Sequence, residues 1–359
     1  MTLKKIGIDV ENGDEVNGES VTKRMVPAVL GISKERPDVE ISIHGHEKRI
    51  KDAFGKNLPS QITVVPASEF YSQSDELSRP RRGSVLYNLA DSVHKGEIDG
   101  FFSIGDTSKI AKEGLRMRVK GAKPSLVGIF PNIKGGEFVL SDIGFTNQTS
   151  KKRLYSDVIN EWAGTVYSQG IMASVYMQSR GVEKPKWGIL SIGTEEHKGS
   201  DVDKRLEEMI HQGIKEKGLD RFVEYVGKVE PKDCFDGKID IALEQGYIAN
   251  KLLKMAEGSL GVIKHWAKGE ISRLDAIDKL RLASGKGVLE KMKNNILDKA
   301  NPDKYSGALI LGFEGVAVKG HGASSRDAIY YGIHNLANCT NENSGKKLME
   351  IVHQYTPSK

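Results

Sequence analysis

Cysteine is scarce in this chain of 359 residues, which contains only Cys234 and Cys339. Two cysteines build no framework of disulfides, and the nine histidines show no HxxxH spacing. The CxxC pairs that mark many structural zinc sites are missing as well. We therefore expect a protein of a reducing compartment, without a metal site.

Long hydrophobic runs and a strong charge of one sign are also missing. No stretch reaches the roughly 18 continuous apolar residues that a membrane span needs. The start, MTLKKIGIDV, enters a short strand without the apolar core of a signal peptide, so we expect a cytoplasmic protein. The net charge is only +5, with acidic and basic residues interspersed. This mild positive charge is compatible with an anionic substrate or an acidic carrier protein, but it does not indicate a nucleic-acid partner.

Several motifs of common enzyme classes are absent. The chain has no GxSxG elbow, no Walker loop and no GxGxxG turn. These absences argue against a serine hydrolase, a P-loop enzyme or a simple dinucleotide-binding protein. We also find no internal repeat and no low-complexity linker.

What the chain does have is a series of short apolar segments that alternate with helical patterns. These segments cover residues 6–10, 40–45, 62–67, 100–104, 125–130, 137–144, 187–193, 222–227, 240–246 and 308–320. Several are almost continuously apolar, which is typical of strands buried on both faces of a parallel sheet. The alternation predicts an α/β fold of three layers (αβα), with a doubly wound, mostly parallel sheet.

The longer helical patterns indicate how this fold is organised. Residues 157–180 fit one long helix that links two regions of the sheet, and residues 247–300 form a helical insertion before the last strands. We expect residues 1–359 to form a single α/β domain of two lobes around a cleft. The insertion is expected to make a dimer contact.

The stretch FFSIGDTSKIAKEG (101–114) raises a question about the end of one strand. The apolar run stops at Gly105, and Asp106, Thr107 and Ser108 then begin a helix. The unpaired amides of a helix N-terminus bind anions, so the stretch fits an anion cradle. Asp, Thr and Ser are also common helix caps, so an ordinary cap fits as well.

Glycines and polar residues follow six of the predicted strands. Because ligands of open α/β sheets bind at the carboxyl ends of strands, we expect these residues to form one rim. The candidates are Asp9, Asp14, Gly105, Asp106, Thr107, Gly144, Gly193, Glu195, Lys198, Gly246, Asn250, Lys319 and His321. Turns and caps explain single members equally well. Lys319 and His321, an ammonium and an imidazole two residues apart, suit phosphate or a developing oxyanion.

The order of these motifs resembles that of the PlsX-type phosphate acyltransferases of phospholipid synthesis, over essentially the whole chain. IDVENGD (8–14) is similar to the family's strand and DAMGGD, and SIGDTSK (103–109) is similar to SAGNTGA. SIGTEEHKG (191–199) resembles NIGEEEGKG, and QGYIAN (245–250) resembles DGFVGN. PNIKGGEFVLSDIG (131–144) resembles the stretch that ends in DVGAN. GALILGFEGVAVKGHGASS (307–325) matches the closing motif.

The resemblance implies a fold related to phosphotransacetylases and the isocitrate dehydrogenase group. It also implies a homodimer that transfers an acyl chain from acyl carrier protein to inorganic phosphate, with no cofactor. Residues 263–287 would correspond to a hairpin that packs in the dimer or makes weak peripheral contact with a membrane.

The residue roles are carried over in the same way. Gly105, Thr107, Lys198 and Lys319 would bind phosphate, with Asp106, Gly144, Gly193, Glu195 and Gly246 at the same site. His321 and Asn250, together with Lys319, would be catalytic and would act on the thioester carbonyl. Asp9 and Asp14 would shape the facing turn.

The chain departs from the family pattern at four places, with Asp106 for Asn, Ser108 for Gly, Phe145 for Ala and Gln245 for Asp. Two alternatives therefore stay open. One is a divergent enzyme that phosphorolyses a short-chain acyl thioester, for which Cys234 and Cys339 are the residues to test. The other is a non-catalytic protein that binds phosphate or an acyl group.

Overall fold

A single mixed sheet of eleven strands runs through the molecule. The computed structural model describes residues 3–55, 57–69, 81–145, 154–195, 197–273, 307–340 and 344–356. The strands, in chain order, are β1 (Lys4–Asp9), β2 (Val39–Gly45), β3 (Ile62–Pro66), β4 (Gly100–Ser103), β5 (Ser125–Pro131), β6 (Glu137–Leu140), β7 (Lys186–Leu190), β8 (Glu224–Val229), β9 (Ile241–Leu243), β10 (Ala308–Leu311) and β11 (Val316–Lys319). Every predicted segment contains a strand, and the last one contains two.

The strand order is β3-β2-β1-β4-β11-β10-β5-β6-β9-β7-β8. β10 is antiparallel to both of its neighbours, and β5 is antiparallel to β6. The other pairs are parallel. The mostly parallel sheet is confirmed, but β6, β7 and β9 run opposite to β1, β4 and β11. The expectation of one rim is therefore wrong, because the six strand ends fall into two groups.

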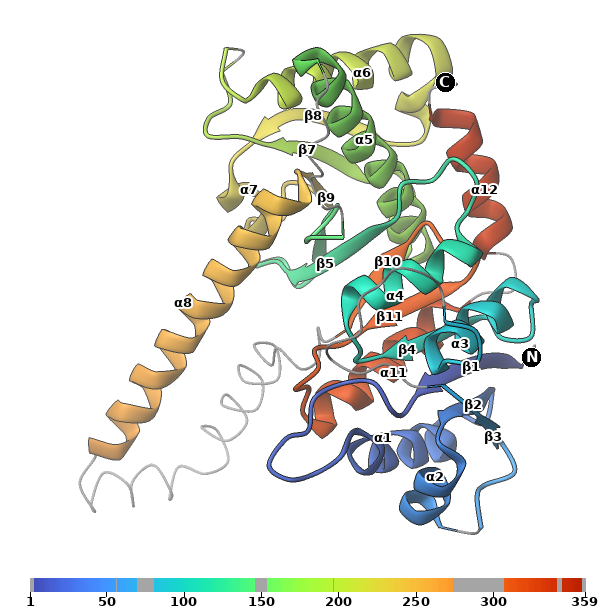
Figure 1. The fold of residues 1–359 in the computed structure, drawn as a ribbon. Coiled ribbons are helices and arrows are strands. Elements are labelled where there is room, and N and C mark those ends of the chain that lie inside the picture. Colours follow the sequence, from blue (N-terminus) through green and yellow to red (C-terminus); the bar gives the residue numbers. More distant parts are fainter. Residues whose placement is uncertain are drawn as a thin grey trace.

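Helices cover both faces of this sheet, which confirms the three layers (Figure 1). The apolar pattern explains the burial, since the consecutive Phe101 and Phe102 pack into separate clusters on opposite faces. One face carries α1 (Val21–Glu35), α2 (Glu47–Phe54), α5 (Tyr155–Ser179), α6 (Asp201–Lys217), α11 (Arg326–Cys339) and α12 (Ser344–Tyr355). The other face carries α3 (Val85–His94), α4 (Thr107–Gly114), α7 (Pro231–Phe235) and the start of α8 (Gly246–Arg273). The short 3-10 turns are η1 (Leu115–Met117) and η2 (Leu219–Arg221).

Two long helices were predicted, and both begin where expected. α5 is the helix predicted over 157–180, and its Ser174 hydroxyl accepts a hydrogen bond from the buried indole of Trp187 at 2.8 Å. α8 is the first part of the predicted insertion and projects from the body of the molecule (Figure 1). Residues 274–300 of that insertion lie outside the described residues. Within the described part of the chain, no helix is both long and apolar enough to cross a membrane.

Candidate functional site

The turn after β1 is built around the carboxylate of Asp9, which is fully buried. It accepts hydrogen bonds from the amides of Glu11 and Asn12, both at 3.0 Å, and from the Ser103 hydroxyl at 2.6 Å. Burial raises the pKa of Asp9, although these hydrogen bonds oppose the shift. Asp9 thus joins the ends of β1 and β4, and its oxygens are occupied by this task.

Gly105 lets the next turn pass close to that of β1. Its amide donates to the Ser103 hydroxyl at 3.0 Å. A Cβ at this position would lie only 2.9 Å from the Cβ of Asn12. The turns after β1 and β4 therefore pack directly against each other, as the strand-end hypothesis requires.

Asp106 caps α4, which answers the question raised by residues 101–114. Its side chain accepts from the amides of Ser108 and Lys109, at 2.9 and 3.2 Å, and from the Ser108 hydroxyl. Burial would raise the pKa of Asp106, but these hydrogen bonds outweigh it and lower the pKa. A carboxylate thus already occupies the two amides that a bound anion would use. The amide of Thr107, the first helical residue, is not among its donors.

Lys319 ends β11 directly beside the end of β4, where it pairs with Ser103. Burial lowers the pKa of its ammonium, and a nearby lysine, Lys254 of α8, lowers it further. Asp106 and Asp14 oppose this shift. Lys319 is therefore a partly desolvated cation, placed between carboxylates of two loops and an ammonium of the projecting helix.

His321 lies in a tight turn two residues beyond Lys319. Its carbonyl accepts from the amide of Ser324 at 2.9 Å, and its Nδ1 accepts from the amide of Ala323 at 3.2 Å. Because Nδ1 is the acceptor, a neutral ring carries its proton on Nε2. The exposed imidazole thus presents an N–H donor to the solvent side of the turn. Ser325 caps α11, and its side chain accepts a hydrogen bond from the amide of Ala328 at 3.0 Å.

Asp14 touches this turn from the loop after β1. Its amide donates to the carbonyl of Gly322 at 3.2 Å, and its carboxylate packs against the Cα of the same glycine. Asp9, Asp14, Gly105, Asp106, Thr107, Lys319 and His321 thus form one group, at the ends of β1, β4 and β11. We call this group the lysine–histidine site.

The second group lies at the ends of β6 and β9. The Asp142 carboxylate accepts from the amides of Gly144 and Phe145, at 3.2 and 2.9 Å. Gly144 has φ +114°, and a Cβ there would lie 2.7 Å from Nδ2 of Asn250. Gly246 packs in the same way against the Asp142 carboxylate. Only glycine fits at these contacts, which bring Asn250 of α8 against the turn after β6.

The loop after β7 forms its own contacts. Gly193 packs closely against the side chain of Glu195, and the amide of Lys198 donates to the Glu195 carbonyl at 3.0 Å. Gly199, with φ +98°, lies against Asp203 at the start of α6. Lys198 therefore lies after β7, in the half of the sheet that contains β6 and β9.

Lys254 links the two groups and was missed in the sequence. It lies four residues after Asn250 on α8, so both side chains share one helix face. Asn250 meets the turn after β6, and Lys254 is close enough to influence Lys319. Helical spacing from Asn250 is the signal that would have identified it.

Glu244 was also missed. It directly follows β9, is only 8% exposed, and accepts a hydrogen bond from the amide of Gln245 at 2.7 Å. Burial raises its pKa to about 8, with a contribution from Asp203. The signal that could have identified Glu244 in the sequence is a carboxylate within the apolar run DIALEQG.

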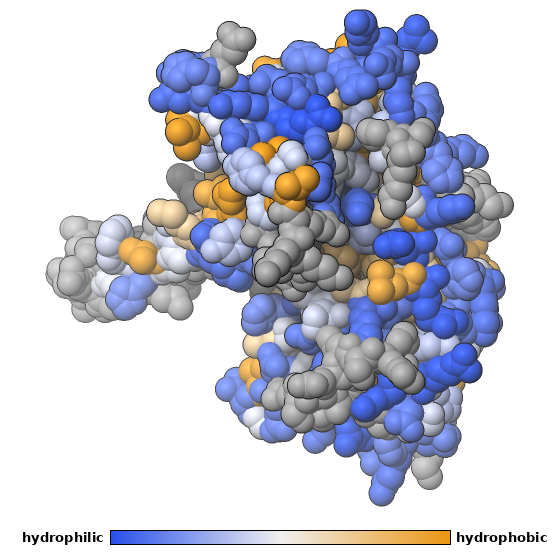
Figure 2. Space-filling model, turned by 45° about the horizontal axis from the view of Figure 1, so that its top comes forward, coloured by the Kyte–Doolittle hydropathy of each residue, from blue (hydrophilic) through white to orange (hydrophobic). Residues whose placement is uncertain are grey.

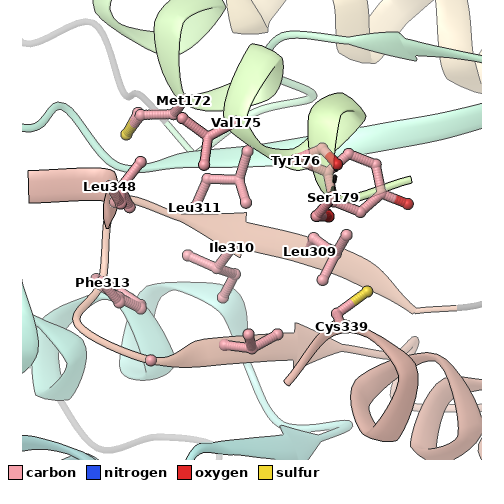
Figure 3. A pocket seen from close by; sticks show the side chains of 13 residues that line it. Met172, Val175, Tyr176, Ser179, Leu309, Ile310, Leu311, Phe313, Cys339 and Leu348 are labelled. Atoms are coloured by element: carbon pink, nitrogen blue, oxygen red, sulfur yellow. Dashed lines mark hydrogen bonds between the residues drawn. The ribbon is translucent and has the colours of Figure 1, made fainter. Parts of the chain in front are cut away.

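The two cysteines lie apart from both groups. Burial raises the pKa of Cys234 to about 12 and that of Cys339 to about 11, so both thiols stay protonated at neutral pH. Cys339 lines an apolar pocket over β10, with Met172 and Val175 of α5 and Leu348 of α12 (Figure 3). This pocket lies on the face of α5, α11 and α12, opposite to α4 and α8. The geometry favours a packing role over a nucleophilic one.

Within the ranges that the structure describes, no group of three or more histidine, cysteine or acidic side chains is placed so that it could hold a metal ion. The two groups described above offer lysine, histidine and asparagine donors, backbone amides and buried carboxylates.

Comparison with known proteins gives a consistent picture. The model of one protein family, described as fatty acid synthesis protein, matches residues 5–347. A phosphate acyltransferase of Staphylococcus aureus (strain bovine RF122 / ET3-1) is 30% identical over 358 residues, or 98% of both chains. One of Ligilactobacillus salivarius (strain UCC118) is 28% identical over 342 residues, 93% of this chain and 94% of its own.

Solved structures agree at the level of the fold. A phosphotransacetylase from Streptococcus pyogenes matches with a TM-score of 0.58 at 16% identity, over 96% of this chain and 94% of that chain. A branched-chain phosphotransacylase from Enterococcus faecalis V583 matches with a TM-score of 0.54 at 14% identity, over 94% and 100%. The expected phosphotransacetylase-like fold is thus confirmed.

Proposed function

The chain belongs to the phosphate acyltransferase family, a family of enzymes, and from that premise we propose the following reaction. The protein transfers an acyl group from the thioester of acyl carrier protein to inorganic phosphate, and the acyl phosphate formed serves phospholipid synthesis. We propose that the reaction takes place in the cytoplasm. We propose that the substrates bind in a cleft between two lobes of one domain, with the lysine–histidine site on one side and α8 on the other.

In this reaction an oxygen of hydrogen phosphate attacks the thioester carbonyl. The tetrahedral oxyanion collapses, the carbon–sulfur bond breaks, and the thiolate leaves and takes up the proton that phosphate releases. Lys319 binds phosphate together with the Thr107 amide, and Lys198 approaches from the other half of the sheet. The Nε2–H of His321 and the amide of Asn250 donate to the oxyanion.

The single observation that carries the proposal is the environment of Lys319. Its ammonium is disfavoured by burial and by Lys254, so a bound phosphate dianion would stabilise both cations at once. Asp106 and Asp14 are the counterions present now, and the phosphate enters beside them.

The direct test is to incubate the purified protein with palmitoyl-acyl carrier protein and phosphate, and to follow free thiol and acyl phosphate. We expect thiol release that depends on phosphate and matches the acyl phosphate formed. Release without phosphate would indicate hydrolysis and would contradict the proposal. Lack of release with a folded protein would favour the non-catalytic alternative.

A short-chain substrate is a second candidate, favoured by Phe145. Its ring packs edge-on against Phe313, with centroids 6.3 Å apart, where the family has alanine. A side chain of this size fills space that a long acyl chain could otherwise use. Acetyl, hexanoyl and palmitoyl thioesters, compared in wild type and Phe145→Ala, separate the candidates: a gain for palmitoyl only in the variant identifies Phe145 as the restriction.

We further propose a homodimer through α8. Ile248, Leu252, Met255, Ser259, Val262 and Trp266 follow one another at spacings of four and three, which is the seam of a two-helix coiled coil. Met255 and Trp266 are 73% and 66% exposed in the single chain, and apolar side chains are visible along the projecting arm (Figure 2). Sedimentation should give a dimer that Met255→Glu dissociates. Binding of anionic vesicles, lost in the same variant, would instead assign the seam to a membrane.

A further inference from the structure

Arg24 of α1 is a buried arginine near the lysine–histidine site, and its side chain is held by backbone carbonyls. The residue is only 3% exposed. Its guanidinium donates to the carbonyl of Ser324 at 2.6 Å, to that of Gly322 at 3.0 Å, and to that of Asp14. These three acceptors belong to two loops, the one after β1 and the one after β11, which carries His321.

This arrangement is an unfavourable way to gain stability alone. Transfer of a guanidinium out of water is costly, and burial lowers the pKa of Arg24, although the nearby carboxylates of Glu19 and Asp14 oppose this shift. The three hydrogen bonds of the guanidinium nevertheless go to carbonyl oxygens. Nε of Arg24 is also buried without a hydrogen-bond partner among the described residues. The compensation is geometric, because one rigid planar group fixes three carbonyls of two loops at once.

The fixed carbonyls lie directly next to the predicted chemistry. Gly322 follows His321, and Ser324 is the residue whose amide closes the His321 turn at 2.9 Å. The carbonyl of Gly322 also accepts from the amide of Asp14 at 3.2 Å. A movement of Arg24 would therefore loosen the turn that sets the direction of the imidazole, although Arg24 itself does not reach the substrate.

We propose that Arg24 is a positioning residue, which holds the His321 turn against the loop after β1 so that Nε2–H points at the oxyanion. The proposal rests on the acyl transfer proposed above. It predicts an effect on turnover that passes through His321, and it predicts little effect on the affinity for phosphate.

The test is a double-mutant cycle between Arg24→Gln and His321→Ala, with Arg24→Lys as the milder variant should Arg24→Gln not fold. Thiol release gives kcat and KM, and thermal unfolding is measured in parallel. The matched control is Arg326→Gln, since Arg326 joins the same region through an exposed ion pair with Glu19 at 2.5 Å. We expect kcat to fall at least tenfold in Arg24→Gln and to stay within twofold in Arg326→Gln.

In the His321→Ala background, Arg24→Gln should reduce kcat by less than twofold, because the group that it positions is gone. Full multiplication of the two effects would show a general structural role and overturn the proposal. An unchanged kcat in the single variant would do the same.

Amide hydrogen exchange makes the outcome independent of activity. Faster exchange confined to residues 10–18 and 320–325 in Arg24→Lys is expected, whereas faster exchange throughout α1 and α11 would contradict it. If the wild type releases no thiol, the proposed function fails, and this exchange pattern still decides whether Arg24 holds the two loops.

Discussion

Replacement of Asp106 by Asn removes a negative charge at the site where phosphate is proposed to bind. The amide oxygen of Asn caps a helix about as well as a carboxylate does, so the bonds from Ser108 and Lys109 persist. Two unit charges about 4 Å apart at an effective dielectric constant of about 20 interact by ~4 kcal/mol. Because Asp106 is exposed, solvent screening reduces the expected gain to ~1 kcal/mol.

A gain of this size corresponds to a fall in KM for phosphate of about fivefold. The assay is phosphate-dependent thiol release over a range of phosphate concentrations. Asp106→Ala is the matched variant: it removes the same charge and also the cap, so KM should fall as well, while the stability of the fold drops by ~1 kcal/mol. Asp106→Asn should unfold at nearly the wild-type temperature.

The same substitution should alter the pH profile. Asp106 supports the charge of Lys319, whose pKa burial already lowers. Without that carboxylate the ammonium loses its proton at a lower pH, so the alkaline limb of the activity profile should shift to lower pH. An unchanged or higher KM for phosphate in both variants would refute the placement of phosphate beside Asp106.

Three further predictions concern other groups. His321→Ala should lower kcat at least tenfold, on the order of one lost oxyanion donor, and an unchanged kcat with intact stability would contradict this role. Burial raises the pKa of Glu244 to about 8 from a usual 4.5. As pH rises, the unfolded chain therefore loses this proton before the folded protein does, and the free energy of unfolding falls between these two pH values. Urea unfolding at about pH 5 and about pH 8 measures this fall, which should be smaller in Glu244→Gln than in the wild type. Cys339→Ala should leave the rate of thiol release from the substrate unchanged, and a large loss of activity would instead support a mechanism that uses this cysteine. In the wild type, the Cys339 thiol has a pKa of about 11 and should react slowly with iodoacetamide near pH 7.

The strands were predictable because their signal is local. Runs such as GFFS and KWGIL are apolar at every position or nearly so, and burial on both faces of a sheet is the simplest cause. The cap at Asp106 was predictable for the same reason, since the side chain bonds amides two and three residues away. Both predictions depend on neighbours in the sequence.

Strand direction was not predictable in this way. Nothing in ALIL or EFVL indicates that β10 opposes both neighbours or that β6 opposes β5, because direction follows from how distant segments pair. Arg24 was missed for a related reason. It occupies an ordinary helical position in α1, and its carbonyl partners lie at positions 14, 322 and 324.

The position of β10 and β11 in the sheet has a consequence for synthesis of the chain. β4 ends at Ser103 and β5 begins at Ser125, yet the hairpin of residues 308–319 separates them in the sheet. While the chain emerges from the ribosome, β4 and β5 therefore expose unpaired edges until that hairpin has been made. Such edges pair readily with other chains. The nascent protein is thus most prone to aggregation, and most dependent on chaperones, during the long interval before its halves are joined.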